Sequence, residues 1–240
     1  MQHFKKIVLN VPHASIEGLC DPQLSFWDLS PAFYNECILK WTDWYTDNLF
    51  SFPNDKRIEM VRFPFSRFIV DAERLWDDPM ENIGQGIVYT DFEMFHRHIS
   101  DASIMKGLRQ YWMEHQVNLA NHLSEDSLLI DCHSFPRQLS DIDICIGYNE
   151  DWSKPNDETI NTISHIFSQE GYHVGVNQPY SNSITPSAPF QYKSLMIEVN
   201  KRTYLQESSL FLDEAKFTRL KETIHKVYQQ IIISNNKVRL

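Results

Sequence analysis

The chain has 240 residues, 42% of them hydrophobic, and a formal net charge of −10. This composition excludes an intrinsically disordered chain, and no apolar run approaches the length of a membrane-spanning helix. The acidic balance disfavours nucleic acids and membranes as partners, because phosphate backbones and anionic lipids repel such a chain.

The N-terminal segment has no apolar core of the length that a signal peptide needs, since only a short run separates its two lysines from Pro12. The 4 cysteines form no CxxC pair, which is typical of reduced thiols rather than of a disulfide framework. No shift in composition marks a domain boundary. We therefore expect a cytoplasmic protein with a single domain over residues 1–240.

Short apolar runs alternate with helical stripes along the chain. Strands are expected at residues 6–11, 67–70, 128–130, 142–146, 171–176 and 194–199. Helices are expected at residues 31–50, 101–123, 157–169 and 217–231, and the irregular segment 77–100 is typical of a functional loop. The alternation predicts an α/β fold of three layers, with a mixed, mostly parallel sheet covered by helices on both faces.

Reactive side chains gather at the ends of several predicted strands, where open α/β sheets bind their ligands. His13 follows the first strand, Asp131 and His133 follow the strand at 128–130, and Glu198 lies within the last apolar run. Two histidines with carboxylates have the composition of a zinc site, although a single histidine at a strand end is more often a turn or core residue. Asp131 has two simpler interpretations, since an aspartate at this position can cap a turn or orient a neighbouring histidine without binding the metal itself.

Covalent catalysis ranks below metal-assisted hydrolysis. Cys132 and His133 are adjacent on a strand and therefore point to opposite faces, which is a poor arrangement for a nucleophilic dyad. Ser15 and Ser134 lack the Gly-x-Ser-x-Gly turn that exposes a hydrolase serine.

Seven segments, in order, resemble the N-formylglutamate amidohydrolase family, whose fold is similar to that of zinc carboxypeptidases and aspartoacylases. They are VPHAS at 11–15, TDWYTDNLF at 42–50, SRFIVDAER at 66–74, GQGIVYT at 84–90, LIDCHS at 129–134, NQPY at 177–180 and IEVNKRTY at 197–204. The resemblance implies a zinc-dependent hydrolase that cleaves N-formylglutamate, a small anionic substrate, into formate and glutamate.

The resemblance also implies roles for particular residues. His13 and His133 match the metal-binding histidines, and one carboxylate completes the set. Asp43 is the favoured third ligand to the single zinc ion, although spacing alone places Asp43 and Asp47 on a solvated helix face. The other candidates for this ligand are Asp47, Asp71 and Glu73. The expected functional groups are Glu198 as general base, Arg67 on the substrate carbonyl, Arg74 on its carboxylate, and Asn177 and His115 in substrate binding.

Two departures from the pattern concern specificity. Glu73 stands where carboxypeptidases and aspartoacylases have Asn, and a carboxylate there would repel an anionic substrate. The loop that follows NQPY reads Ser181-Asn182-Ser183 in place of glycine, and it is expected to shape the specificity pocket. The remaining alternatives are a zinc peptidase or amidase acting on a peptide or cell-wall fragment, and a non-catalytic binding protein on the same fold.

Overall fold

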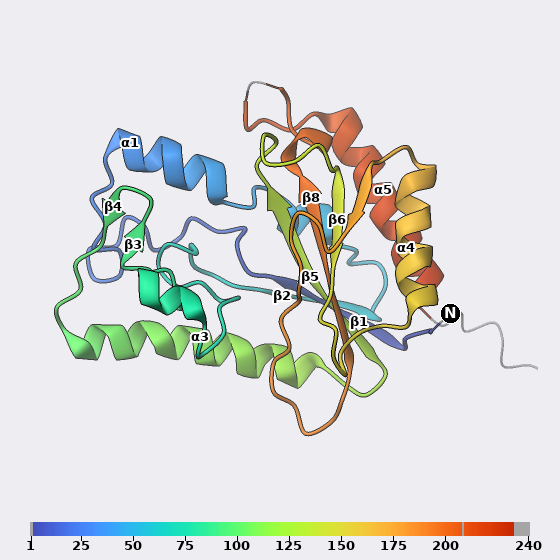
Figure 1. Cartoon of the computed structure of the whole chain (residues 1–240), viewed down its shortest axis with the longest axis horizontal. Coiled ribbons are helices and arrows are strands. Elements are labelled where there is room, and N and C mark those ends of the chain that lie inside the picture. Colours follow the sequence, from blue (N-terminus) through green and yellow to red (C-terminus); the bar gives the residue numbers. More distant parts are fainter. Residues whose placement is uncertain (1, 208, 233–240) are drawn as a thin grey trace, which may run out of the picture.

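A computed structural model describes residues 2–207 and 209–232, and its centre is a six-stranded sheet (Figure 1). The order of the strands is β2-β1-β5-β8-β6-β7, and only the β8–β6 pair is antiparallel. The strands are β1 (Lys6–Val11), β2 (Ile58–Arg62), β5 (Ser127–Phe135), β6 (Ile144–Gly147), β7 (Val174–Val176) and β8 (Lys193–Asn200). This arrangement confirms the predicted α/β fold with a mixed, mostly parallel sheet.

Alternation along the strands gives the sheet two different faces. On one face, residues such as Ile130, Cys132 and Ile197 pack against the apolar stripe of the last helix, which includes Leu220 and Ile224. The helices of this face are α2 (Thr46–Phe50), α4 (Asp157–Gln169) and α5 (Glu214–Ile231), and Figure 1 shows α4 and α5 beside the sheet. The other face carries the polar side chains of Asn10, Asp131, His133 and Glu198.

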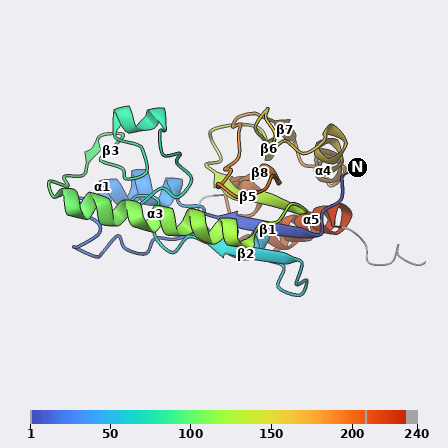
Figure 2. The same cartoon turned by 90° about the horizontal axis from the view of Figure 1, so that it is seen from below.

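The helix α3 (Ala102–His122) covers part of that second face with its C-terminal half, where Leu119 packs with Val8 and Leu129. Its N-terminal half joins a second apolar cluster, which contains Phe33, Phe68 and Leu108. This cluster surrounds α1 (Pro31–Phe33) and the hairpin of β3 (Asp91–Phe92) and β4 (Phe95–His96). Figures 1 and 2 both show α3 extending from this region to the sheet, so one helix connects the two clusters.

The predicted helix over residues 31–50 is wrong in its middle. The structure divides it into α1, the π-helix η1 (Tyr34–Leu39) and α2, with a break before Thr46. At the break, the backbone N–H of Asp43 donates to the His13 carbonyl oxygen at 3.0 Å, and Tyr45 has a left-handed φ of 62°. A long-range backbone contact therefore replaces the helical one, and it brings Asp43 beside His13.

Other elements also differ from the predicted ones, and the short strands β3 and β4 lie in the segment 77–100, which was expected to be irregular. Residues 67–70 form a turn rather than a strand, because the N–H groups of Ile69 and Val70 both donate to the Ser66 carbonyl oxygen. Their apolar character reflects burial in the second cluster. The edge strand β2 is absent from the predicted set, since its mixture of apolar and charged residues has no clear period. Within the described part of the chain, no helix is long and apolar enough to cross a membrane.

Candidate metal centre

Two histidines and one aspartate from three different elements meet on the polar face of the sheet. His13 directly follows β1, His133 lies near the end of β5, and Asp43 occupies the helix break. Asp43 Oδ2 lies 3.1 Å from His133 Nδ1 and 3.7 Å from His13 Nδ1. One ligand atom from each residue falls within 4.8 Å of the other two, and all three side chains are buried. These residues can therefore share one ion.

The chemistry of this cluster fits a divalent transition metal. The buried His13 Nδ1 atom has no hydrogen-bond partner among the described residues, although it faces the Asp43 carboxylate. Two imidazole nitrogens and one carboxylate oxygen are a common protein ligand set for catalytic zinc, which keeps a fourth position open. The residues that would hold a zinc ion are therefore His13, Asp43 and His133.

The ionisation of the cluster follows from burial and close charges. Burial lowers the pKa of His13, and the Arg67 guanidinium lowers it further. Burial also acts to lower the pKa of His133, but the carboxylates of Glu73 and Asp43 outweigh it and raise this pKa well above the ordinary value. For Asp43, burial acts to raise the pKa, yet the hydrogen bond from His133 brings it below the ordinary value.

Asp71 joins the metal cluster to the guanidinium groups. Its Oδ1 atom lies 2.8 Å from His13 Nε2, and its Oδ2 atom accepts hydrogen bonds from Arg67 and from the Tyr89 hydroxyl. Arg67 and Arg74 each donate to the Tyr89 oxygen at 3.2 Å. Burial acts to raise the pKa of Asp71, but His13 and Arg67 hold it well below its usual range. The two guanidiniums are thus fixed beside the candidate metal centre.

Glu198 approaches the same centre from the neighbouring strand. It is aligned with His133 in the parallel β5–β8 pair, so both side chains emerge on the polar face. Burial raises the pKa of Glu198 to about 8, and the charge of Asp43 adds to this effect. A carboxyl group with a pKa near neutrality can both accept and return a proton, as a general base must.

A cavity of about 820 Å³ contains these groups, and Trp41, Phe92, Phe135 and Tyr180 contribute aromatic walls to it. The loop residues Ser181, Asn182 and Ser183 line it as well. Of the residues singled out in the sequence, the cavity brings together His13, Asp43, Arg67, Asp71, Glu73, Arg74, His133 and Glu198. Asp47 lies apart from them and forms an ion pair with Arg62.

His115 and Asn177 are not among the described residues that line the cavity. His115 is buried on α3, where its Nε2 atom donates to Asn10 Oδ1 at 2.9 Å and its ring packs edge-on against Phe63. Asn177 has a left-handed φ of 53°, and its side-chain oxygen accepts from the Tyr148 N–H. Their part in substrate binding stays a prediction.

The position of His115 leads to a prediction about acid stability. Burial lowers the pKa of His115 to about 4, from an ordinary value of 6.5. Between these values the unfolded chain binds the proton and the folded protein does not, so the free energy of unfolding falls as the pH falls. Protonation of His115 should therefore lower the free energy of unfolding by about 3 kcal/mol between these two pH values, at about 1.4 kcal/mol for each pKa unit. Urea unfolding at pH 7 and pH 5 measures this effect. The free energy of unfolding should fall less between the two pH values for His115→Phe than for the wild type, and an equal fall would contradict the prediction.

Three further residues of the site lie in segments that were singled out in the sequence, but the contacts that they make were not predicted. Tyr89 holds both arginines, yet in the sequence it is one aromatic residue in an apolar run. The Ser134 hydroxyl donates to Asp43 Oδ1 at 3.2 Å. Asp131 accepts from Ser183 Oγ and from the Ile184 N–H, so it anchors the loop that lines the cavity. The hydrogen bonds of Asp131 go to Asn10, Ser183 and Ile184, so its interpretation as a direct hydrogen-bond partner of a histidine is wrong.

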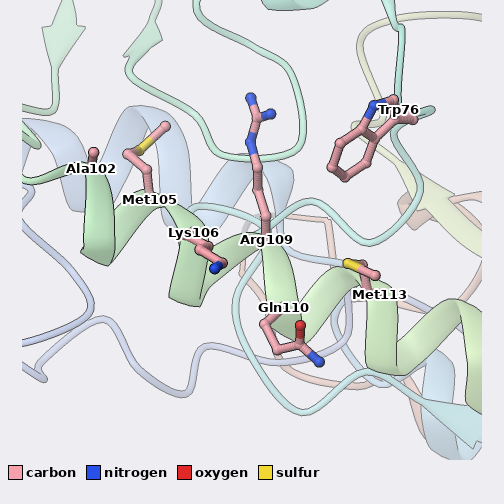
Figure 3. A pocket seen from close by; sticks show the side chains of 7 residues that line it. All are labelled: Trp76, Ala102, Met105, Lys106, Arg109, Gln110 and Met113. Atoms are coloured by element: carbon pink, nitrogen blue, oxygen red, sulfur yellow. The ribbon is translucent and has the colours of Figure 1, made fainter.

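A second, smaller hollow of about 460 Å³ lies along α3 (Figure 3). Its lining includes Trp76, Met105, Arg109 and Met113, and no histidine or carboxylate lines it among the described residues. Figure 3 shows that most of these side chains come from α3, with Trp76 facing them from another segment. The smaller hollow therefore offers no histidine or carboxylate ligand for a metal ion among the described residues, and its charged groups are the cations Lys106 and Arg109.

Comparison with known proteins assigns the chain to a family. The family model described as N-formylglutamate amidohydrolase matches residues 5–205, so the chain belongs to that family. Among solved structures, an N-formylglutamate amidohydrolase from Ralstonia eutropha JMP134 is similar, with 15% identity, a TM-score of 0.73 and coverage of 96% of this chain and 95% of that chain. A gene product from Agrobacterium tumefaciens is also similar, with 14% identity, a TM-score of 0.63 and coverage of 95% and 92%.

These two likenesses establish the fold. A comparison with curated proteins gave no match. The family membership confirms the resemblance drawn from the seven segments, and the buried His13–Asp43–His133 cluster adds a possible metal site to it.

Proposed function

We propose that this protein is a zinc-dependent amidohydrolase that cleaves the amide bond of a small N-acyl amino acid, with N-formylglutamate as the first candidate substrate. The observation that carries the proposal is the meeting of three buried ligand atoms within 4.8 Å in a cavity that also contains Glu198 and two arginines. Membership of the N-formylglutamate amidohydrolase family supports the same reaction class.

A zinc ion held by His13, Asp43 and His133 would polarise the amide carbonyl and lower the pKa of the attacking water. The carboxylate of Glu198 accepts a proton from that water as its oxygen forms a bond to the acyl carbon. As the C–N bond breaks, Glu198 returns the proton to the departing amine, so the products are the free acid and the amino acid. The position of Glu198 beside His133 in the register suits this transfer.

The arginines account for binding and for charge stabilisation. Arg67 stabilises the negative charge that develops on the carbonyl oxygen, because it is fixed by Asp71 and Tyr89 before the substrate arrives. Arg74, on the same tyrosine, binds the carboxylate of the amino acid through its planar guanidinium group. The Nε atoms of both arginines have no hydrogen-bond partner among the described residues.

The second candidate is a peptidase or amidase for a larger substrate, and the size of the cavity favours it. A volume of about 820 Å³ lies in the range that accommodates drug-sized ligands, so it leaves room beyond the scissile bond. The carboxylate of Asp151 on the cavity wall also disfavours a second negative charge on the substrate.

A panel of amides tests both candidates. Zinc-loaded protein should hydrolyse N-formyl amino acids with a higher kcat/KM than N-acetyl amino acids or dipeptides, and N-formylglutamate should be among the best substrates. A higher kcat/KM for the dipeptides would favour the second candidate. The Asp43→Asn variant, purified in the same way, controls for contaminating hydrolases. A chain that binds zinc and hydrolyses none of the panel would favour a binding protein instead.

A further inference from the structure

Glu73 contacts the side of His133 that faces away from Asp43. Glu73 Oε1 lies 2.8 Å from His133 Nε2, whereas Asp43 Oδ2 lies 3.1 Å from His133 Nδ1. The contact with Glu73 is an ion pair rather than an aligned hydrogen bond. The His133 ring is thus held between two carboxylates, one at each nitrogen.

His13 has the same arrangement. Asp71 Oδ1 lies 2.8 Å from its Nε2 atom, and Asp43 Oδ2 faces its Nδ1 atom at 3.7 Å. Each imidazole therefore has its Nδ1 atom toward the shared carboxylate of Asp43 and its Nε2 atom next to a carboxylate of its own. Metal-binding histidines commonly donate their second ring N–H to such an outer carboxylate, which fixes the tautomer and the orientation of the ring.

One short turn supplies both outer carboxylates. Glu73 follows Asp71 by two residues, and its backbone N–H donates to Asp71 Oδ1 at 3.1 Å. Helix α3 holds the backbone on either side of Glu73, because Gln116 donates to the Ala72 carbonyl oxygen and Trp112 donates to that of Arg74, each at 2.8 Å. The turn is therefore anchored independently of the two histidines.

We propose that Glu73 is a positioning residue for His133, and that it keeps the ring proton on Nε2 so that Nδ1 is presented to the shared ion. Asp71 has the same relation to His13. This inference rests on the proposed function, because it assumes a metal at the His13–Asp43–His133 cluster. It also accounts for glutamate at this position, since one of its carboxylate oxygens contacts the imidazole of His133.

The geometry disfavours two other roles for Glu73. A direct metal ligand would join the group of ligand atoms that lie within 4.8 Å of one another, and that group contains His13, Asp43 and His133 without Glu73. A substrate-binding group would have a free carboxylate, whereas one Glu73 oxygen already contacts His133. Glu73 therefore acts through His133.

Zinc affinity measured by competition with a chromogenic chelator tests this role. We expect Glu73→Ala to weaken zinc binding by about 10–100-fold, the usual effect of losing an outer carboxylate. Glu73→Gln, which keeps the shape and an acceptor oxygen but removes the charge, should fall between Glu73→Ala and the wild type. The matched control is Glu93→Ala, which removes a cavity carboxylate that is paired with Lys40 rather than with a histidine.

Nitrogen NMR of the histidine rings in the zinc-loaded protein gives a second readout, in which His133 should carry its proton on Nε2 and bind through Nδ1. Unchanged affinity in Glu73→Ala, or binding of His133 through Nε2, would overturn the inference. A loss of zinc as complete as in Asp43→Asn would overturn it too, because Glu73 would then be a ligand. If the wild type binds zinc and hydrolyses no amide, only the proposed function fails; if it binds no zinc, both fail.

Discussion

The Glu198→Gln variant should lose roughly 10²–10⁴-fold in kcat while it keeps its zinc, because the substitution removes the general base and leaves the metal ligands in place. Glutamine has the shape of glutamate but cannot accept the proton of the attacking water. The buried position of Glu198 and its raised pKa of about 8 are consistent with a carboxyl group that exchanges a proton near neutral pH.

The measurement is kcat on the best substrate of the amide panel, together with the zinc content of each preparation. Glu93→Gln is the matched control, since Glu93 also lines the cavity but pairs with Lys40 at its edge. Its kcat should stay within about threefold of the wild type, far below the loss expected for a general base. Unchanged turnover in Glu198→Gln would remove Glu198 from the mechanism.

The Asp43→Asn variant should lose zinc affinity by well over ~100-fold, more than the removal of any outer carboxylate, and its hydrolytic activity should disappear with the metal. The substitution keeps the side-chain shape but removes the only negative charge among the three proposed ligands. It also leaves the two imidazoles beside each other, with ring centroids 5.1 Å apart, without the carboxylate between their Nδ1 atoms.

Asp47→Asn provides the comparison, because Asp47 is the other aspartate of the same sequence motif. Its carboxylate is partly exposed and pairs with Arg62 at 3.2 Å, outside the cavity. Zinc titration and kcat should both be unchanged in this variant. Equal zinc affinity in Asp43→Asn and the wild type would show that another carboxylate, such as Asp71 or Glu73, completes the metal site.

The two histidines and the candidate base could be identified from the sequence because they lie at or near the ends of predicted strands, where the backbone restricts the direction of each side chain. A buried strand fixes the direction of each side chain by its period of two, and parallel strands place their carboxyl ends at one edge of the sheet. His13, His133 and Glu198 could therefore be placed together from the order of the apolar runs. The register in which His133 pairs with Glu198 agrees with that reasoning.

The position of Asp43 beside the histidines could not be predicted from spacing in the sequence. Helical spacing placed it on a continuous solvated face, whereas the structure breaks the helix and buries it against His13 and His133. The break depends on the hydrogen bond from the Asp43 N–H to the His13 carbonyl oxygen, and on Lys201, whose amino group donates to the Lys40 carbonyl oxygen at 2.5 Å. Neither partner is near in sequence, so no local pattern could reveal it.

The sequence by itself determined the class of fold, the family and the residue types available for metal-assisted hydrolysis, because hydrophobic periodicity and motif order are local properties. Only the tertiary structure decided which carboxylates meet the imidazoles, that Asp71 and Glu73 flank them from one turn, and that His115 and Asn177 lie outside the cavity lining. These features depend on contacts between segments far apart in the chain, and the packing of α3 and the helix break sets those contacts.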